Sequence, residues 1–386
     1  MTNRSGAFTL TLTLMFLFFS LNGTCGGTGE DKSAWPAWRG PNGDRISREA
    51  NWDPGFLAVG PELLWRAKIG AGYSNVSINN DRLYTAGKSL RHVIYCLDAW
   101  TGEEIWRYEG GVNEEVQGTP TVDGRSVYSL FYNGDLLIIT SNTAGLAVDK
   151  NTGERIWGSE RPPGKVCEVV ETLYTAFANG TDYSAPVVYK YGGIHRALIS
   201  SWAGMHSVDA ETGVVNWLFP WKIYSGGQVA DPLCFDQMIF ISGNVSLGSI
   251  LLDISSGQPE VLWRNENLCA DTSTAVMIDG YLYGCAGGPE ARHCFLRCVD
   301  VRTGEIAWEQ DFGRMQLTVL GAGNKVIIME DIGMLRIAEA TPDAYVEVSS
   351  CQLPAERGHK NGGPRRFCTR ASCTAETTTA ICCVSM

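Results

Sequence analysis

Short segments in which apolar and polar residues alternate run along most of the chain, separated by turn residues. In residues 273–283, an apolar segment, an Asp-Gly turn and a second segment ending in an aromatic residue follow one another. Segments of the same plan begin at Ser74 and Gly118. This alternation predicts β-strands, and Asp-Gly between two of them predicts a hairpin. Helical periodicity is nearly absent, and the one short helix that we predict lies within residues 165–180.

A turn motif recurs within this pattern: an apolar residue, Asp, two residues, Thr or Ser, Gly and, four residues later, Trp. Asp accepts hydrogen bonds from the backbone N–H groups that follow it, and Gly supplies the positive φ that ends the turn. The motif therefore predicts a hairpin whose second strand buries its Trp against a neighbouring sheet. One copy, at Asp253, has its Trp two residues late. The five copies are Asp98/Gly102/Trp106, Asp149/Gly153/Trp157, Asp209/Gly213/Trp217, Asp253/Gly257/Trp263 and Asp300/Gly304/Trp308.

The spacing of the tryptophans, roughly 40–60 residues, is typical of propeller blades. We predict an all-β propeller of seven blades, each a four-stranded antiparallel sheet, with eight blades as the alternative. A degenerate sixth copy of the motif makes Tyr345 a candidate for a further Trp position. Trp65 has no turn motif before it, so we expect residues near 61–68 and the C-terminal strands to close the ring together, which removes free sheet edges.

Both ends of the chain depart from the repeat. An apolar run from Ala7 to Leu21 follows Arg4; it is short for a membrane span and is typical of a signal peptide. We predict a signal peptide at residues 1–24, an N-terminal arm at 25–60 and the propeller at 61–386. Cys25 is a candidate lipid anchor, the alternative being cleavage nearby without lipid. Residues 351–386 are atypical, and we expect either a divergent last blade or a reading-frame error.

The turn motifs resemble those of the pyrroloquinoline-quinone-type (PQQ-like) repeat β-propellers. The stretch Trp-Pro-Ala-Trp-Arg-Gly-Pro-Asn at residues 35–42 is similar to the N-terminal stretch of exported bacterial members. The resemblance implies the quinoprotein alcohol dehydrogenase-like fold. That family holds quinone- and calcium-dependent alcohol dehydrogenases. It also holds non-catalytic scaffolds, such as the propeller lipoprotein of the outer-membrane β-barrel assembly machinery.

The family's dehydrogenases use an adjacent-cysteine disulfide, a stacking Trp, Glu, Asn and Asp ligands for calcium, and an Asp base. Calcium prefers such oxygen ligands. The one adjacent pair here, Cys382–Cys383, lies in the atypical C-terminal segment. We therefore predict no catalytic residue, no metal site and no cofactor, with PQQ and calcium retained only as the alternative.

Other candidate sites follow from strand order and spacing. The innermost strands of a propeller line its central channel, so we expect a channel-mouth binding site at Tyr73, Gln117, Tyr183, Asp231, Thr272 and Gln316. His206 with Asp209, and His293 with Cys294 and Cys298, have weak catalytic and metal spacings, and we interpret both sets as structural. Cys285 and Cys294 are a candidate disulfide across neighbouring strands. Cys96, Cys298 and Cys383 share one position in the repeat and are expected to be buried.

The formal net charge of −11 argues against nucleic-acid binding, which needs clustered Lys and Arg. Taken together, the sequence predicts an exported, periplasmic, outer-membrane-associated or secreted propeller that acts as a non-catalytic scaffold for protein partners of the cell envelope. The alternatives are a quinone- and calcium-dependent alcohol or sugar dehydrogenase, and a carbohydrate- or small-ligand-binding propeller.

Overall fold

The computed structural model describes residues 35–49, 52–59, 65, 67, 69, 74–88, 92–110, 120–123, 126–128, 131–133, 136–138, 146–149, 151–152, 154–158, 187–201, 204–209, 214–221, 230–243, 247–270, 273–287 and 293–353. The predicted helix at 165–180, the signal peptide, Cys25 and residues 354–386 lie outside these ranges. Within them, no helix combines the length and the apolar character that crossing a membrane requires.

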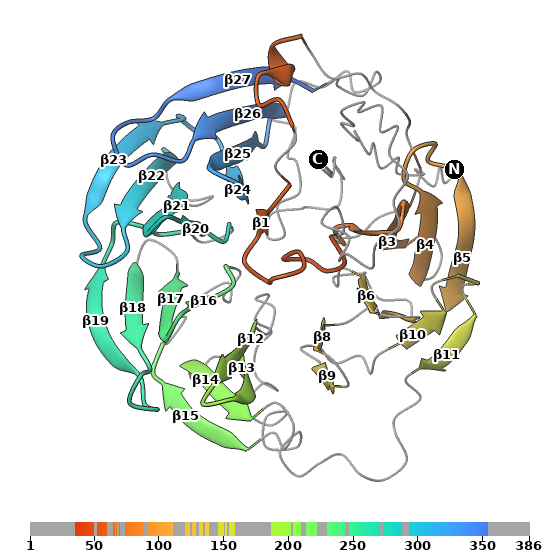
Figure 1. The fold of residues 1–386 in the computed structure, drawn as a ribbon, viewed down its shortest axis with the longest axis horizontal. Helices are drawn as coiled ribbons and strands as arrows, with labels where there is room; N and C mark the ends of the chain where they lie inside the picture. The colour runs from red at the N-terminus through yellow and green to blue at the C-terminus, as the bar shows by residue number, and fades with distance from the viewer. Residues whose placement is uncertain are drawn as a thin grey trace, which may run out of the picture.

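The described strands form sheets that are arranged around a common centre, as Figure 1 shows. Five sheets contain four antiparallel strands each, and the strands follow their order in the chain from the centre to the rim, with one insertion. These sheets are β2 (Ser77–Asn79), β3 (Arg82–Lys88), β4 (His92–Asp98), β5 (Glu104–Gly110); β6 (Thr121–Asp123), β7 (Ser126–Tyr128), β10 (Leu146–Asp149), β11 (Arg155–Gly158); β12 (Val187–Tyr191), β13 (Ile194–Ser201), β14 (Gly204–Asp209), β15 (Val215–Phe219); β16 (Leu233–Phe235), β17 (Met238–Ser242), β18 (Ser249–Asp253), β19 (Glu260–Asn265); and β20 (Val276–Ile278), β21 (Tyr281–Ala286), β22 (Phe295–Asp300), β23 (Ile306–Asp311).

A further sheet has five strands. Four of them are antiparallel, and a two-residue strand of the N-terminal arm, β1 (Ile46–Ser47), adds to the inner one in parallel. The hairpin of β8 (Phe131–Asn133) and β9 (Leu136–Ile138) lies between β7 and β10 in the chain and forms a separate two-stranded sheet. One 3₁₀ helix, η1 (Phe56–Val59), packs on the five-stranded sheet. The antiparallel strands of that sheet are β24 (Leu317–Ala322), β25 (Lys325–Glu330), β26 (Met334–Glu339) and β27 (Glu347–Gln352).

The prediction of an all-β propeller with four-stranded antiparallel blades is confirmed, but the predicted number of blades is wrong for the described residues. They form five four-stranded blades, together with the five-stranded and two-stranded sheets, and not seven or eight blades. The closing blade was expected from residues 61–68 and the C-terminal strands, and residues 61–64, 66, 68 and 354–386 lie outside the description.

The hairpin that ends the first blade follows the chemistry of the repeat. Asp98 Oδ1 accepts hydrogen bonds from the backbone N–H groups of Trp100 and Thr101, at 2.9 and 2.8 Å. Gly102 then turns the chain with φ +71°, and its N–H donates to the Asp98 carbonyl at 2.9 Å. The Asp300 turn repeats this geometry, with Gly304 at φ +73°. A carboxylate that caps the turn and a glycine that tolerates positive φ thus fix where the fourth strand begins.

The turn at Gly257 differs from the turns at Gly102 and Gly304 in the hydrogen bond that its glycine makes. The sequence predicted the same turn at all three. Gly257 has the expected positive φ, +87°, but its N–H donates to the carbonyl of Ile254 at 2.9 Å, not to that of Asp253. Strand β19 begins at Glu260, three residues after Gly257, whereas β5 begins two residues after Gly102. The turn is therefore longer, which explains why Trp263 comes late in the sequence.

One extra residue on the fourth strand, a β-bulge, recurs at the same position in six sheets and places one row of three cross-strand neighbours there. The row holds a Trp on the fourth strand in five of the six, Trp263 after the longer turn included, and Ser349 in the sixth. The rows are Tyr84–Cys96–Trp106, Tyr128–Ala147–Trp157, Leu198–Ser207–Trp217, Phe240–Leu251–Trp263, Tyr283–Cys298–Trp308 and Ile327–Ile337–Ser349.

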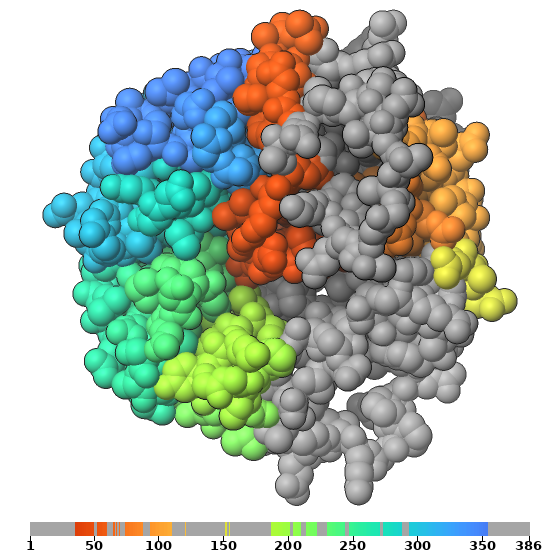
Figure 2. All heavy atoms as spheres, in the orientation of Figure 1, coloured from red at the N-terminus to blue at the C-terminus, as the bar shows by residue number. Residues whose placement is uncertain are grey.

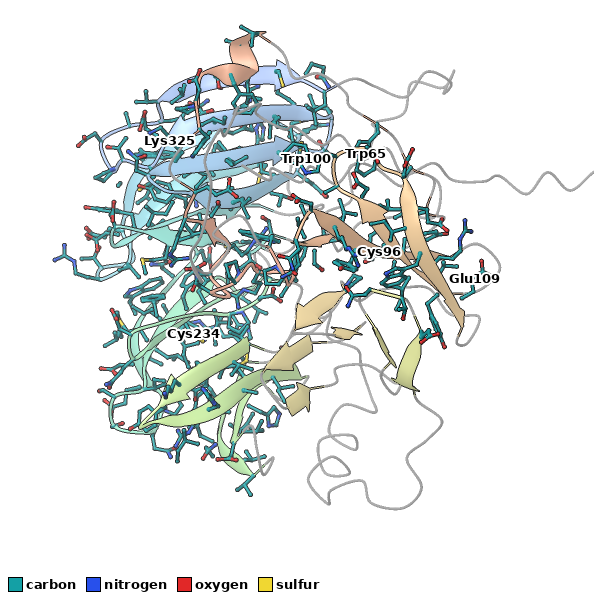
Figure 3. The ribbon with its side chains drawn as sticks, turned by 45° about the vertical axis from the view of Figure 1, so that its right-hand side comes forward. Trp65, Cys96, Trp100, Glu109, Cys234 and Lys325 are labelled. Atoms are coloured by element: carbon teal, nitrogen blue, oxygen red, sulfur yellow. A yellow bond between two sulfur atoms is a disulfide. The ribbon has the colours of Figure 1, made fainter. Side chains whose placement is uncertain are left out.

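Several tryptophans join one blade to the next through their indole N–H groups. Trp263 donates to the carbonyl of Val301, and Trp308 to that of Thr341, at 2.8 and 2.7 Å. Trp65 does the same with Ala99, at 3.0 Å, and lies beside the Trp100 turn in Figure 3. In each case the acceptor lies in the turn after the third strand of the following blade, and the indoles of Trp263 and Trp308 bridge two sheets.

At the Gly257 turn a tyrosine makes this contact in place of a tryptophan. Tyr191, at the end of β12 in the preceding blade, donates its hydroxyl to the carbonyl of Ser255 at 3.1 Å. A Cβ added at Gly257 would meet that hydroxyl oxygen at 3.2 Å, whereas at Gly102 and Gly304 it would overlap an indole ring. The altered turn therefore changes which residue of the preceding blade it contacts.

The register of β27 corrects the expectation for Tyr345. The position that corresponds to Trp in this sheet is Ser349, because the register shifts between Ile337 and Ala338. Tyr345 precedes the strand and packs edge-on against Trp308, with ring centroids 5.9 Å apart. Tyr345 therefore adds to the contact that Trp308 makes between two sheets, which we call a joint. It does not connect its own sheet to a further one.

Candidate functional site

The N-terminal arm, residues 35–49, crosses the inner end of the ring and contacts several blades. Trp35 exchanges two backbone hydrogen bonds with Ile78 of the first blade, at 2.9 and 2.8 Å. At the other end of the arm, β1 pairs with Gly321 and Ala322 of β24. Figures 1 and 2 show the arm running from the β24–β27 sheet over the middle of this face. Residues far apart in the chain therefore meet under one continuous segment.

The middle of the arm is fixed by two polar side chains. Trp38 donates its indole N–H to Asp231 Oδ2 at 2.9 Å, just before β16. Arg45 donates from Nη1 to the Thr274 carbonyl at 3.0 Å, just before β20. Thr274 Oγ1 in turn accepts the backbone N–H of Asp231 at 2.9 Å, which links the inner ends of two neighbouring blades. The arm and the two blade ends thus form one hydrogen-bonded unit.

Two of the predicted channel-mouth residues are described. Asp231 shortly precedes the inner strand β16 and is 3% exposed. Gln316 directly precedes the inner strand β24, and its backbone carbonyl accepts the N–H of Asp331 at 3.0 Å. The arm covers Asp231 and uses its carboxylate as an acceptor for Trp38, a contact that the sequence analysis missed. The other four, Tyr73, Gln117, Tyr183 and Thr272, lie outside the described ranges, as do the repeat glycines Gly153 and Gly213.

Arg39, on the same arm, is a deeply buried cation. It is 2% exposed, and its Nε and Nη1 atoms are buried without a hydrogen-bond partner. Cys234 at the start of the neighbouring blade lies within range of its charge. Burial raises the pKa of the Cys234 thiol to about 12, although the Arg39 charge acts in the opposite direction. A neutral thiol, and not an anion, therefore lies close to this guanidinium.

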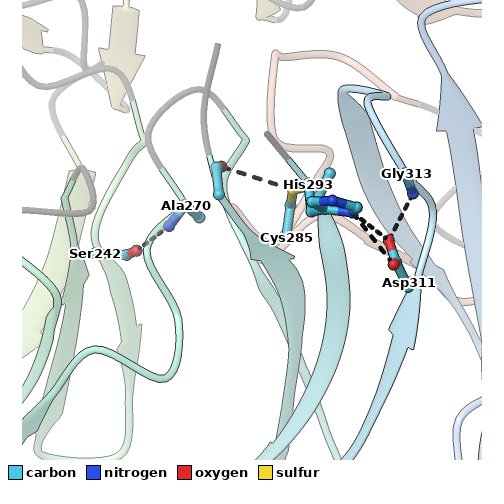
Figure 4. The surroundings of a disulfide bond; sticks show 8 residues. Ser242, Ala270, Cys285, His293, Asp311 and Gly313 are labelled. Atoms are coloured by element: carbon cyan, nitrogen blue, oxygen red, sulfur yellow. Dashed lines mark hydrogen bonds and ion pairs between the residues drawn. A yellow bond between two sulfur atoms is a disulfide. The ribbon is translucent and has the colours of Figure 1, made fainter. Parts of the chain in front are cut away.

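The candidate disulfide is present in the structure and lies at the edge of a blade, as Figure 4 shows. Cys285 on β21 and Cys294 just before β22 are bonded, with their Cα atoms 6.4 Å apart. The neighbouring His293 contacts Asp311 at 3.3 Å across the sheet. Burial raises the pKa of the Cys298 thiol to about 11. The three residues with metal-like spacing therefore have separate surroundings: a disulfide, an exposed ion pair and the sheet interior.

His206 and Asp209 occupy ordinary positions in β14. They are three residues apart on one strand, so their side chains emerge on opposite faces of the sheet. Burial lowers the pKa of His206, which disfavours its charged form. The backbone N–H of Asp209 donates to the Val214 carbonyl at 2.8 Å and closes the repeat turn. This placement does not bring a nucleophile and a base together.

The described residues give little support to a quinone site. No group of three or more His, Cys, Asp and Glu side chains within them is arranged to hold a metal ion. The adjacent cysteines, Cys382 and Cys383, lie outside the description. The carboxylate of Asp231 at the ring centre is hydrogen-bonded to the arm. The part of the chain that the structure describes therefore does not assemble the calcium and quinone apparatus that the resemblance implies.

A family model described as "Outer membrane protein assembly factor BamB" matches residues 58–310, about two thirds of the chain. The chain belongs to this family of PQQ-like repeat propellers. No curated protein matches the chain. The family match confirms the resemblance inferred from the turn motifs.

Among solved structures, the chain is similar to BamB from Moraxella catarrhalis, with 16% identity, a TM-score of 0.46 and coverage of 76% of this chain and 78% of that one. It is also similar to a europium-containing methanol dehydrogenase, with 12% identity, a TM-score of 0.47 and coverage of 84% and 86%. A quinohemoprotein alcohol dehydrogenase from Comamonas testosteroni gives 13% identity, a TM-score of 0.51 and coverage of 83% and 73%. This last similarity supports the fold alone.

Proposed function

We propose that the protein is an exported, non-catalytic propeller that acts as a scaffold for protein partners in the cell envelope. The family match supports this proposal, because the family is described as an assembly factor of the outer membrane. The observation that carries it is the N-terminal arm, which lies over the inner end of the ring. Its bonds to Asp231 and Thr274 fix it to the inner ends of two neighbouring blades.

The blade architecture offers a surface suited to such a role. The outer strands of two neighbouring blades expose apolar side chains, among them Leu218 on β15 at 45% and Leu262 on β19 at 51%. Large contiguous apolar patches mark protein-interaction sites, so these outer strands are the candidate contact surface. A signal peptide at residues 1–24, with or without lipid on Cys25, would deliver this surface to the envelope. The mass of the mature N-terminal peptide distinguishes the two forms of the N-terminus.

The first test separates the scaffold from the dehydrogenase. Purified full-length protein is incubated with pyrroloquinoline quinone, calcium chloride, a redox dye and a series of primary alcohols and sugars. We expect dye reduction no faster than in a sample without protein. Reduction that depends on both substrate and quinone would contradict the proposal.

The second test asks for partners. The tagged protein is used to capture envelope proteins after mild crosslinking, and each captured protein is then purified and titrated against it. We expect at least one saturable complex with a dissociation constant in the micromolar range or below, typical of specific protein pairs. If every captured protein fails to bind when purified, the scaffold proposal is wrong.

A further inference from the structure

The guanidinium of Arg39 is an unusual feature of the inner end of the ring. It is 2% exposed, and neither Nε nor Nη1 has a hydrogen-bond partner. A buried charge that is neither paired nor hydrogen-bonded is strongly unfavourable, so buried arginines are found with anions. In the same arm, Asp44 is already paired with Arg48 at 2.6 Å. Among the described carboxylates, none forms an ion pair with Arg39.

The backbone around Arg39 is held in place from both sides. Its carbonyl accepts the N–H of Arg45 at 3.0 Å, which closes a tight loop in the arm. On the other side, Gly40 has φ +74° and donates its N–H to Ala37 at 3.0 Å. The Trp35 ring lies so close to Gly40 that an added Cβ would overlap it. The backbone that carries the Arg39 guanidinium is therefore held in place before a ligand binds. Binding would not incur the entropic cost of ordering this segment.

A second buried polar group without a partner lies at a blade end that the arm contacts through Arg45. Ser273 is 3% exposed and its hydroxyl has no hydrogen-bond partner. It directly precedes Thr274, whose carbonyl accepts the hydrogen bond from Arg45. The arm and the start of β20 thus each contribute a buried donor that the chain leaves unused.

We propose that Arg39 is the anchor of a carboxylate-binding site under the N-terminal arm. Nε and Nη1 belong to the two different edges of the guanidinium, and each edge also includes Nη2. A carboxylate can bind either edge with two parallel hydrogen bonds, a geometry that arginine provides and lysine does not. The carboxylate is that of a small organic acid or of the free C-terminus of a peptide. This inference goes beyond the scaffold proposal: both involve the N-terminal arm, but a carboxylate at Arg39 requires no protein partner on the outer strands.

The test is a thermal-shift and equilibrium-dialysis series on the full-length protein with four probes: acetate, citrate, triglycine and triglycine amide. We expect a saturable rise in melting temperature with at least one free carboxylate, because a ligand that binds the native state stabilises it. Citrate binding identifies a small acid as the source. Binding of triglycine without binding of its amide identifies a peptide C-terminus. Absence of a saturable effect from every carboxylate at 20–50 mM, roughly the upper range at which weak binding is specific, would overturn the proposal.

The role of Arg39 is tested with Arg39→Gln, which keeps a polar side chain but loses the positive charge and the paired N–H donors of the guanidinium. We expect at least a tenfold loss of affinity. Arg48→Gln is the matched control, since Arg48 lies on the same arm with a side chain that is 55% exposed. If Arg39→Gln binds as tightly as the wild type, the proposal is wrong. Arg39→Lys serves if the glutamine variant does not fold: it keeps the charge, and we expect weaker carboxylate binding, whereas unchanged affinity would again contradict an arginine-specific site.

Discussion

The joint between the β16–β19 and β20–β23 blades differs from the one that the β24–β27 sheet makes. In the first, Trp263 inserts its ring against Gly304 and donates its N–H to the Val301 carbonyl. In the β24–β27 sheet the position of that tryptophan is taken by Ser349, whose hydroxyl donates to the carbonyl of Pro54. Leu57 of η1 is buried on the same sheet. A large residue within the repeat makes one joint, and a segment from the N-terminus completes the other.

This difference shows how a repeat can vary without losing the ring. A tryptophan provides burial and one hydrogen bond from a single residue, and only its own blade and the next are needed. A serine leaves space that another segment must fill, and it makes the blade depend on residues almost 300 positions away. Loss of a tryptophan should therefore destabilise the repeat itself, whereas changes near Ser349 should act through the arm.

The largest effect is expected from removal of a joint tryptophan. Trp308→Ala loses a ring packed against Tyr283 and Tyr345 and the hydrogen bond to Thr341. We expect a loss of about 3 kcal/mol in the free energy of unfolding, as for other large-to-small changes. Denaturant titration measures it. Trp100→Ala is the control, because Trp100 is 45% exposed, and equal losses in the two variants would contradict the role of the joint.

The next effect tests the close approach of tryptophan and glycine. Gly304→Ala introduces a Cβ at φ +73° that would overlap the Trp263 ring. Gly280→Ala has a similar φ of +81° but meets no atom within 4 Å. We expect a loss of about 1 kcal/mol at Gly280, the backbone term alone, and about twice that at Gly304. The same titration compares them, and a larger loss at Gly280 would argue against a tight joint.

On the side without tryptophan, an ion-pair cluster connects β25, β26 and β27. Arg336 contacts Glu330 at 2.5 Å and Glu347 at 2.7 Å, and the Glu330 side chain is 4% exposed. Arg336→Ala leaves a buried carboxylate without its partner, and we expect a loss of about 2 kcal/mol, less than for a fully buried pair. Arg302→Ala is the matched control, since its side chain is 81% exposed. Equal small losses would mean that the cluster contributes little.

The smallest effect is a pH dependence of the same cluster. Burial raises the pKa of Glu347, but hydrogen bonds from Ser350, Arg336 and Tyr345 outweigh it, and the net pKa lies below the usual value. A carboxyl with a lowered pKa in the folded state stabilises the protein above its unfolded pKa. This stability is lost as the pH falls from about 4.5 through the folded pKa. Glu347→Gln should flatten the fall in melting temperature over this range, and an unchanged slope would contradict the assignment.

The blades could be predicted from the sequence because their signals are local. Asp98, Gly102 and Trp106 lie within nine residues, and each has a role that residue chemistry alone suggests. At Gly257 the late Trp263 signalled a departure from the motif, but not that the Gly257 N–H would donate to Ile254 in a longer turn. The exact register of β27 could not be predicted, since the turn before it lacks the glycine that marks the others.

The candidate site was predicted only in part, because its contacts join residues that are far apart in the sequence. Strand order placed Asp231 before an inner strand, but its contact with Trp38 joins residues 193 positions apart. Two-residue parallel pairing, as in β1, leaves no periodic pattern. The one signal that pointed to the arm was the dense Trp-Pro-Ala-Trp-Arg-Gly stretch. It marked the segment without indicating that Arg39 would be buried.

The central claim is that tryptophans of one blade dock on the repeat turn of the next. A double-mutant cycle between Trp263 and Gly304 measures this most directly, with Trp263→Ala, Gly304→Ala and the double variant compared by denaturant titration. We predict a coupling energy of about 1 kcal/mol or more, because removal of the ring relieves the overlap of the new Cβ with the indole, while the overlap with Asn265 Nδ2 remains in both backgrounds. Losses that add to within about 0.3 kcal/mol would show that the two residues do not interact across the blades, and the account would fail.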